Sequence, residues 1–190
     1  MVEPKDVSEI IKKYREIAEK EMRGELPPRP KIESHTQLDL LNPERPFFNS
    51  INRDDSKYVI TFRLARFCKI SRTVGNAAAN ILWYSSGREL GMLLADKGLV
   101  KSVDDIVRVL LDQRIGIVDI VKESSNKMRV HVYECITCSG IPNIGRAECH
   151  FEGGVIAGIL TKLMGSEARV IETHCWGKGN RFCGFDVIFR

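Results

Sequence analysis

The chain has 190 residues, of which 43% are hydrophobic and 28% are charged. This length suits one domain with a sizeable core, and this composition excludes a disordered chain. The balance of 29 Lys and Arg against 25 Asp and Glu gives a formal charge of +4, which does not by itself indicate a nucleic-acid-binding protein. No apolar run approaches the roughly 18 residues that a membrane-spanning helix needs, and the N-terminus carries no secretory signal pattern. We therefore expect a cytoplasmic protein without a membrane segment.

The N-terminal residues 1–30 are predicted to form an amphipathic helix followed by a linker. Apolar side chains repeat at helical spacing over 6–23, and Gly24 ends the pattern. The Leu-Pro-Pro-Arg-Pro segment at 26–30 cannot continue a helix. We therefore divide the chain into an arm at 1–30, with a packing or dimer-stabilising role, and a main domain at 31–190.

The main domain is predicted to contain three further helices. Residues 76–96 are apolar over so much of their surface that we expect them to form the central helix. A second helix begins at a capping box formed by Ser102 and Asp105 and ends near Gly116. A third occupies 148–164, where small residues give it a closely approachable face.

The predicted strands are mostly paired in hairpins. The β-rich run at 58–68 predicts a strand, 117–122 and 128–134 predict a hairpin that turns around 124–126, and 168–174 with 184–189 predict a second hairpin. Hairpins joined through helices indicate an α+β fold, with an antiparallel sheet packed against helices.

Five of the six cysteines lie in the last third of the chain. In a chain without a signal peptide, clustered cysteines more often bind a metal or carry out chemistry than form disulfides. Cys175 and Cys183 would lie at the two ends of the last hairpin loop, and Glu172 three residues before the first of them. Cys149 completes a four-ligand zinc site, because the positive end of the helix at 148–164 favours its thiolate.

Other arrangements of the thiols remain open. Cys135 and Cys138 have the C-x2-C spacing of zinc sites and redox pairs, so an all-thiolate site with Cys175 and Cys183 is chemically as sensible. An iron–sulfur cluster or a dithiol redox pair also fits, and His150 or His174 could replace a ligand. Alternatively, several of these cysteines are small buried hydrophobes, as expected for the isolated Cys68.

The spaced residues resemble the 4-vinyl reductase, or hydrocarbon-binding, domain family. The resemblance covers about 58–190 and rests on Glu134-Cys-x2-Cys-Ser-Gly-Ile-Pro-Asn, Cys149-x-Phe-Glu-Gly, Glu172-Thr-x-Cys and Cys183-x-Phe. It implies an α+β fold, commonly dimeric, related in shape to trafficking-complex subunits that hold an acyl chain. It also implies a structural zinc ion held by Cys149, Glu172, Cys175 and Cys183, which leaves Cys135 and Cys138 as a secondary thiol pair.

Three classes of function follow. The first is a non-enzymatic binding or sensory module, a homodimer that encloses a small hydrophobic or aromatic ligand and has no catalytic residues. Its ligand would lie between the helix at 76–96 and the sheet. The second is a reductase or redox accessory protein acting on a vinyl-bearing tetrapyrrole, although no Gly-x-Gly-x2-Gly motif provides for a nicotinamide or flavin. The predicted lining of the ligand chamber is Phe62, Phe67, Trp83, Tyr84, Met92 and Leu93.

The third class is nucleic-acid binding. Arg63, Arg66, Lys69 and Arg72 are interleaved with two phenylalanines. We interpret these basic residues as a solvated face at a strand end, and we do not expect a nucleic-acid partner.

Overall fold

The computed structural model describes residues 4–122, 124 and 126–190. None of the helices in this part of the chain combines the length and the apolar character needed to cross a membrane. The helices and strands are α1 (Pro4–Met22), η1 (Leu38–Leu40), α2 (Pro46–Ile51), α3 (Asp55–Arg63), η2 (Leu64–Ile70), α4 (Ser71–Val74), α5 (Asn76–Asp96), α6 (Val103–Asp112), β1 (Ile117–Lys122), β2 (Lys127–Tyr133), α7 (His150–Met164), β3 (Ala168–His174), η3 (Trp176–Lys178) and β4 (Cys183–Phe189).

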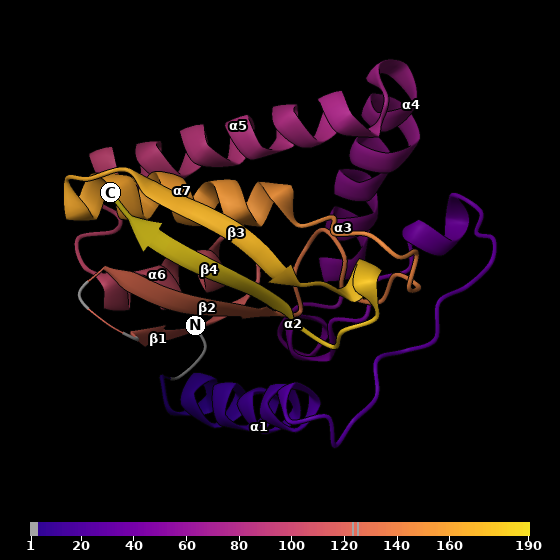
Figure 1. The fold of residues 1–190 in the computed structure, drawn as a ribbon, viewed down its shortest axis with the longest axis horizontal. Helices are drawn as coiled ribbons and strands as arrows, with labels where there is room; N and C mark the ends of the chain where they lie inside the picture. Colours follow the sequence, from indigo (N-terminus) through magenta and orange to yellow (C-terminus); the bar gives the residue numbers. More distant parts are fainter. Residues whose placement is uncertain (1–3, 123, 125) are drawn as a thin grey trace.

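The sheet has four strands in the order β1-β2-β4-β3, and every neighbouring pair is antiparallel. In Figure 1, α7 lies on one face of this sheet, α5 lies outside α7, and α1 covers the opposite face. The predicted α+β fold and both predicted hairpins are confirmed. Of the first hairpin's predicted turn at 124–126, residue 125 lies outside the described part of the chain.

The central helix is α7 rather than α5, so the prediction for 76–96 is wrong in this respect. All nine residues from Glu152 to Leu160 are buried. In α5, by contrast, Ile81 is 71% exposed and Leu82 and Leu93 are each 51% exposed. The sequence of α5 is apolar because the helix is packed tightly on one side and carries apolar residues on its outer side as well.

The packing of α5 on α7 depends on glycines in both helices. A Cβ atom on Gly91 of α5 would lie 2.2 Å from the carbonyl oxygen of Val155, and one on Gly158 of α7 would lie 2.1 Å from that of Arg88. Since no larger side chain fits at these points, the two backbones lie in direct contact.

The predicted strand at 58–68 is also wrong, because this segment is helical from α3 into the π-helical turn η2. Its buried residues recur at Val59, Arg63, Arg66 and Phe67, a helical rather than an alternating spacing. The β-forming side chains of this run were misleading because tertiary contacts of the two buried arginines outweigh local propensity.

Helix α1 packs on the sheet through polar and aromatic contacts. Arg15 donates a hydrogen bond from Nε to Asp119 Oδ2 of β1 at 2.8 Å. Tyr14 stacks on Tyr133 of β2, with ring centroids 5.1 Å apart. Buried Ala18 adds an apolar contact to the same face. The division of the chain at residue 30 stays a prediction, but the helix itself is joined to the sheet.

Candidate metal centre

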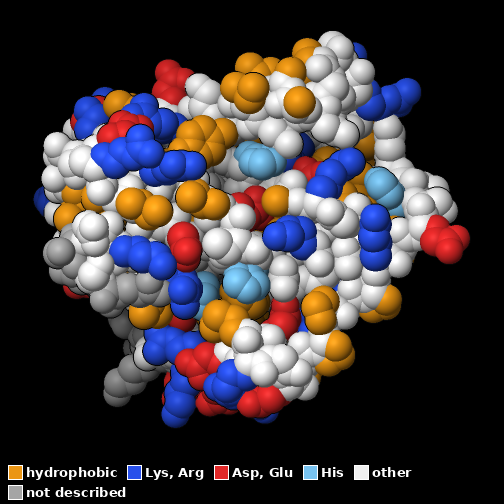
Figure 2. Space-filling view, viewed as in Figure 1, with side chains coloured by type: hydrophobic (Ala, Val, Ile, Leu, Met, Phe, Trp, Pro, Cys, Tyr) orange, Lys and Arg blue, Asp and Glu red, His pale blue; other side chains and the backbone are white. Residues whose placement is uncertain are grey.

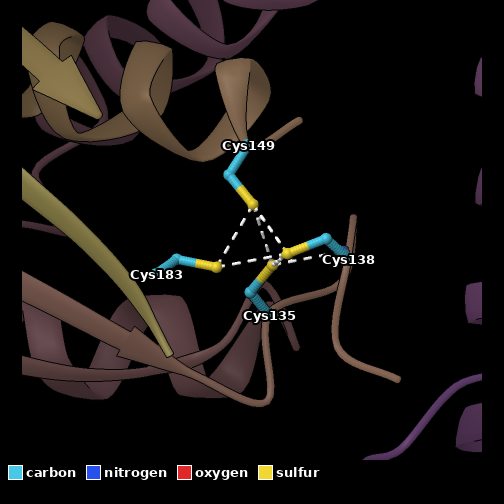
Figure 3. Close-up of side chains that lie close together, drawn as sticks. All are labelled: Cys135, Cys138, Cys149 and Cys183. Atoms are coloured by element: carbon cyan, nitrogen blue, oxygen red, sulfur yellow. Dashed lines mark hydrogen bonds between the residues drawn. The ribbon is translucent and has the colours of Figure 1, made fainter. Parts of the chain in front are cut away.

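Six potential metal ligands converge where β2, α7, β3 and β4 meet. Cys135 and Cys138 lie in the loop after β2, and Cys149 is the N-cap residue of α7. Cys183 is the first residue of β4. Figure 3 shows these four side chains pointing their sulfur atoms at one another. Two further donors come from β3 and the residue after it, namely Glu172 and Cys175.

The five thiols form one buried cluster. The Sγ atom of Cys149 lies 3.3 Å from that of Cys135, 2.9 Å from that of Cys138 and 3.3 Å from that of Cys183. Cys175 approaches from the other side, with its Sγ atom 3.8 Å from those of Cys149 and Cys138. All five have no exposed surface. The sequence therefore correctly predicted a cysteine constellation, whereas isolated Cys68 lies apart from it.

Glu172 reaches the cluster at the start of α7. Its carboxylate oxygens accept hydrogen bonds from the Cys149 backbone N–H at 3.1 and 3.3 Å. Burial, together with the charge of Cys175, raises the pKa of the Glu172 carboxyl well above its usual range. A bound cation would offset this cost, since an opposite charge favours the ionised carboxylate.

Backbone donors face two of the sulfur atoms. The Cys138 N–H points at Cys135 Sγ at 3.3 Å, and the Glu148 N–H points at Cys175 Sγ at 3.4 Å. Burial opposes ionisation of Cys135 and Cys175, but hydrogen bonds from neighbouring groups lower the pKa of each thiol well below its ordinary value. The thiolate is the form that binds metals, so both positions are prepared for coordination.

Two fully buried arginines brace the loops that carry the cysteines. Arg63 donates hydrogen bonds to the carbonyl oxygens of Ile136 at 2.9 Å and Ser139 at 2.8 Å, which flank the C-x2-C turn. Arg66 donates to the carbonyl oxygen of Glu148 at 2.6 Å and to its carboxylate at 2.8 Å. The sequence interpretation of these two residues as a solvated basic face is wrong. Their burial also makes them inaccessible to a nucleic acid.

Glu152 is a further residue whose role the sequence did not assign. Its carboxylate accepts hydrogen bonds from the Thr137 backbone N–H at 3.0 Å and hydroxyl at 2.9 Å. Since Glu152 lies three residues after Cys149 in α7, this pair fixes the C-x2-C turn to the helix. Its place in the Cys149-x-Phe-Glu-Gly motif was the available signal. Burial raises the pKa of this carboxyl well above its usual range.

Two sets of four donors each have the composition of a tetrahedral zinc site. The first is Cys149, Glu172, Cys175 and Cys183, and the second is Cys135, Cys138, Cys149 and Cys183; within each set the donor atoms lie within 4.8 Å of one another. Thiolate and carboxylate ligands suit zinc. No histidine of the described residues joins either set.

The predicted ligand-lining residues lie at several places around α5. Phe62 and Trp83 are in ring contact, with centroids 5.0 Å apart, and Phe151 of α7 completes an aromatic cluster at 5.5 and 5.9 Å. The Trp83 indole N–H has no hydrogen-bond acceptor among the described residues. Phe67 is in the core, and Leu93 faces outward. Tyr84 and Met92 are half-buried on α5.

A groove of about 1270 Å³ lies along edge strand β1, between α1 and α6. It is open to solvent and contains none of the six predicted lining residues. Apolar side chains form much of its wall, with acidic and basic groups around them. Its apolar lining residues are Val7, Ile11, Val103, Val107, Leu111, Val118, Ile120, Met128 and Met164.

Comparison with known proteins adds a family and two related folds. Residues 128–189 match the model of the 4-vinyl reductase domain family. The chain is 35% identical over 129 residues to the uncharacterized protein MJ1642 of Methanocaldococcus jannaschii, which spans 68% of this chain and 76% of that protein. A crystal structure of a vinyl-4-reductase family protein from the same organism has a TM-score of 0.52 and 17% identity, covering 84% of this chain and 98% of that one.

The second related fold is a trafficking protein particle complex subunit 3 from Naegleria fowleri, covalently bound to palmitic acid. It has a TM-score of 0.52 and 14% identity, covering 74% of this chain and 96% of that one. At these identities the two structures establish a shared fold, as the sequence predicted.

Proposed function

The chain belongs to the 4-vinyl reductase domain family, and from this premise we propose that it is a non-enzymatic module that binds a small apolar molecule and contains structural zinc. The observation that carries the ligand-binding part is the groove between α1, α6 and β1. Ligand sites are concave and mostly apolar, with a few polar groups that fix orientation. Nine of the residues that line the groove are apolar, and Arg15, Arg108 and Asp119 are among its polar groups.

We assign the zinc ion to Cys149, Glu172, Cys175 and Cys183. This set is supported by the buried carboxylate of Glu172, whose ionised form needs a nearby cation, and by the N–H donor to Cys175. Bound there, zinc would link the start of α7 to the β3–β4 hairpin. Structural zinc contributes an apparent stabilisation of about 10–16 kcal/mol in small sites, which is comparable to the whole stability of a domain.

Isothermal titration calorimetry with phenol and with palmitate tests the ligand-binding proposal. We expect one of these probes to bind at one site per chain. Val107→Trp, which fills the groove, should abolish this binding if the ligand occupies the groove. Loss in Trp83→Phe instead would assign the ligand to the aromatic cluster predicted from the sequence, because that change removes the unpaired indole N–H. Zinc-loaded protein that shows no saturable heat with either probe would overturn the proposal.

We also propose that the protein is a cytoplasmic homodimer. Support for the dimer comes from the outer side of α5, where Ile81, Leu82 and Leu93 are exposed opposite the glycines that contact α7. Figure 2 shows hydrophobic side chains gathered over this upper part of the molecule, while Lys, Arg, Asp and Glu are interspersed elsewhere on the same face. Light scattering should give twice the chain mass for the native protein and the chain mass for Leu82→Glu. A native monomer would contradict the dimer.

A further inference from the structure

The two sets of potential zinc ligands share an edge. Cys149 and Cys183 belong to both, and their Sγ atoms lie 3.3 Å apart. Cys135 and Cys138 complete one set, while Glu172 and Cys175 complete the other. One tetrahedral zinc ion takes four ligands, so it would leave two buried donors of this cluster unused. Two tetrahedra that share two ligands need six donors in total, which is the number the cluster provides.

Both unshared pairs have the surroundings of metal thiolates. In the first pair, Cys135 Sγ accepts the Cys138 N–H, and in the second, Cys175 Sγ accepts the Glu148 N–H. Hydrogen bonds of this kind from the shell around a metal site stabilise its ligands in their charged form. Isolated buried cysteines that serve only as small hydrophobes have no need of such donors.

The charge around the C-x2-C turn supports the same conclusion. Arg63 is completely buried and donates to the carbonyl oxygens of Ile136 and Ser139, on either side of Cys138. Among the described residues it forms no salt bridge with a carboxylate. A buried guanidinium of this kind requires a nearby negative charge. Five thiolates and one carboxylate around two divalent ions leave an excess negative charge that Arg63 would partly neutralise.

We propose that the centre is binuclear, with a second zinc ion bound by Cys135 and Cys138 and sharing the Cys149 and Cys183 thiolates with the first. This inference rests on the zinc site of the proposed function. Tetrahedral geometry with zinc–sulfur bonds of about 2.3 Å places sulfur atoms about 3.8 Å apart. The contacts of 2.9–3.3 Å around Cys149 therefore widen when metal binds. Each thiol releases its proton to solvent as it coordinates.

Metal titration of the reduced, chelator-treated full chain tests this proposal without any substitution. Cobalt(II) added in place of zinc reports each thiolate-bound site through its charge-transfer absorbance. We expect the absorbance to rise until two equivalents per chain are bound. Native mass spectrometry of zinc-loaded protein should likewise show two zinc ions. A titration that ends at one equivalent would overturn the binuclear centre.

Paired substitutions then identify the ligands. The Cys135→Ser/Cys138→Ser variant and the Glu172→Gln/Cys175→Ser variant should each retain one zinc ion, whereas Cys149→Ser should lose both. Cys68→Ser is the matched control and should retain two, because Cys68 lies outside the cluster. Cadmium NMR of the wild type should show two coupled resonances, one from an all-sulfur site and one from a site with an oxygen ligand.

The outcomes separate this inference from the proposed zinc site. A single zinc ion that is retained in Cys135→Ser/Cys138→Ser and lost in Glu172→Gln/Cys175→Ser would overturn the binuclear centre and leave the first site intact. A single ion with the opposite dependence would overturn both, as would iron with inorganic sulfide in the purified protein.

Discussion

Gly154→Ala should loosen the packing of α5 on α7, whereas Gly153→Ala in the next position should be tolerated. An ideal Cβ atom on Gly154 would lie 2.1 Å from the Tyr84 carbonyl oxygen, whereas one on Gly153 would lie 3.3 Å from the Phe185 ring. Real Cβ atoms essentially never come within 3.0 Å of another heavy atom, so Gly154→Ala must push the two helix backbones apart by about 1 Å. The Phe185 ring can shift by a few tenths of an ångström instead.

The size of the effect follows from two opposing contributions. Both variants gain about 1 kcal/mol of helix propensity, because alanine replaces glycine inside a helix. Overpacking against a rigid backbone costs about 1–3 kcal/mol, and only Gly154→Ala incurs it in full. The two variants should therefore differ in the free energy of unfolding by about 1–3 kcal/mol. For a chain of this length, about 2 kcal/mol corresponds to a Tm difference of about 4–8 °C.

Thermal unfolding followed by circular dichroism, at one fixed concentration of free zinc, measures this difference. Fixing the zinc concentration matters because a ligand that binds only the folded state raises Tm by mass action. Equal Tm values for the two variants, or a higher Tm for Gly154→Ala, would refute the tight contact between the helices.

Three further changes probe buried polar groups and a helix cap. Burial lowers the pKa of His131 from 6.5 to about 4, so the unfolded chain takes up the proton first and stability should fall by up to about 3 kcal/mol as pH drops from 6.5 to 4. His131→Gln should flatten this dependence in urea titrations, and parallel profiles would contradict it. Asp55→Ala deprives the buried Arg45 guanidinium of a carboxylate 3.2 Å away and should cost about 3–5 kcal/mol in urea unfolding, largely recovered in Arg45→Met/Asp55→Leu. Ser102→Ala removes the capping box of α6 and should lower the unfolding free energy by about 1 kcal/mol, whereas unchanged stability would show that the cap contributes nothing.

Local patterns in the sequence were sufficient to predict most helices and strands. The predicted helix at 76–96 coincides with α5, and the capping box of Ser102 and Asp105 starts α6 as expected. Both hairpins form because alternating and turn-forming residues act over short distances along the chain. The layer order was less accessible, because an apolar outer face on α5 and a buried face have the same composition.

The segment at 58–68 and the choice of zinc ligands could not be settled from spacing. Arg63 and Arg66 are buried only because the loops around the cysteines offer them carbonyl oxygens, and these loops are more than 70 positions away in the chain. Likewise, the C-x2-C spacing does not reveal that β2 and β4 are neighbours, which brings Cys135 close to Cys183. Tertiary contacts of this kind decide which ligand set forms.

The loop between β2 and α7 explains why charged residues accumulate around the metal centre. Residues 134–149 form neither a helix nor a strand of the sheet, yet most of them are buried. Their backbone carbonyl groups must find donors, since an unpaired buried polar group is costly. Arg29, Arg63 and Arg66 provide those donors at distances of 2.6–2.9 Å. These arginines fix the loop's backbone but not its sulfur atoms, so the ordered position of the thiols depends on metal binding. The accepting carbonyl groups belong to Ile136, Ser139, Ile141 and Glu148.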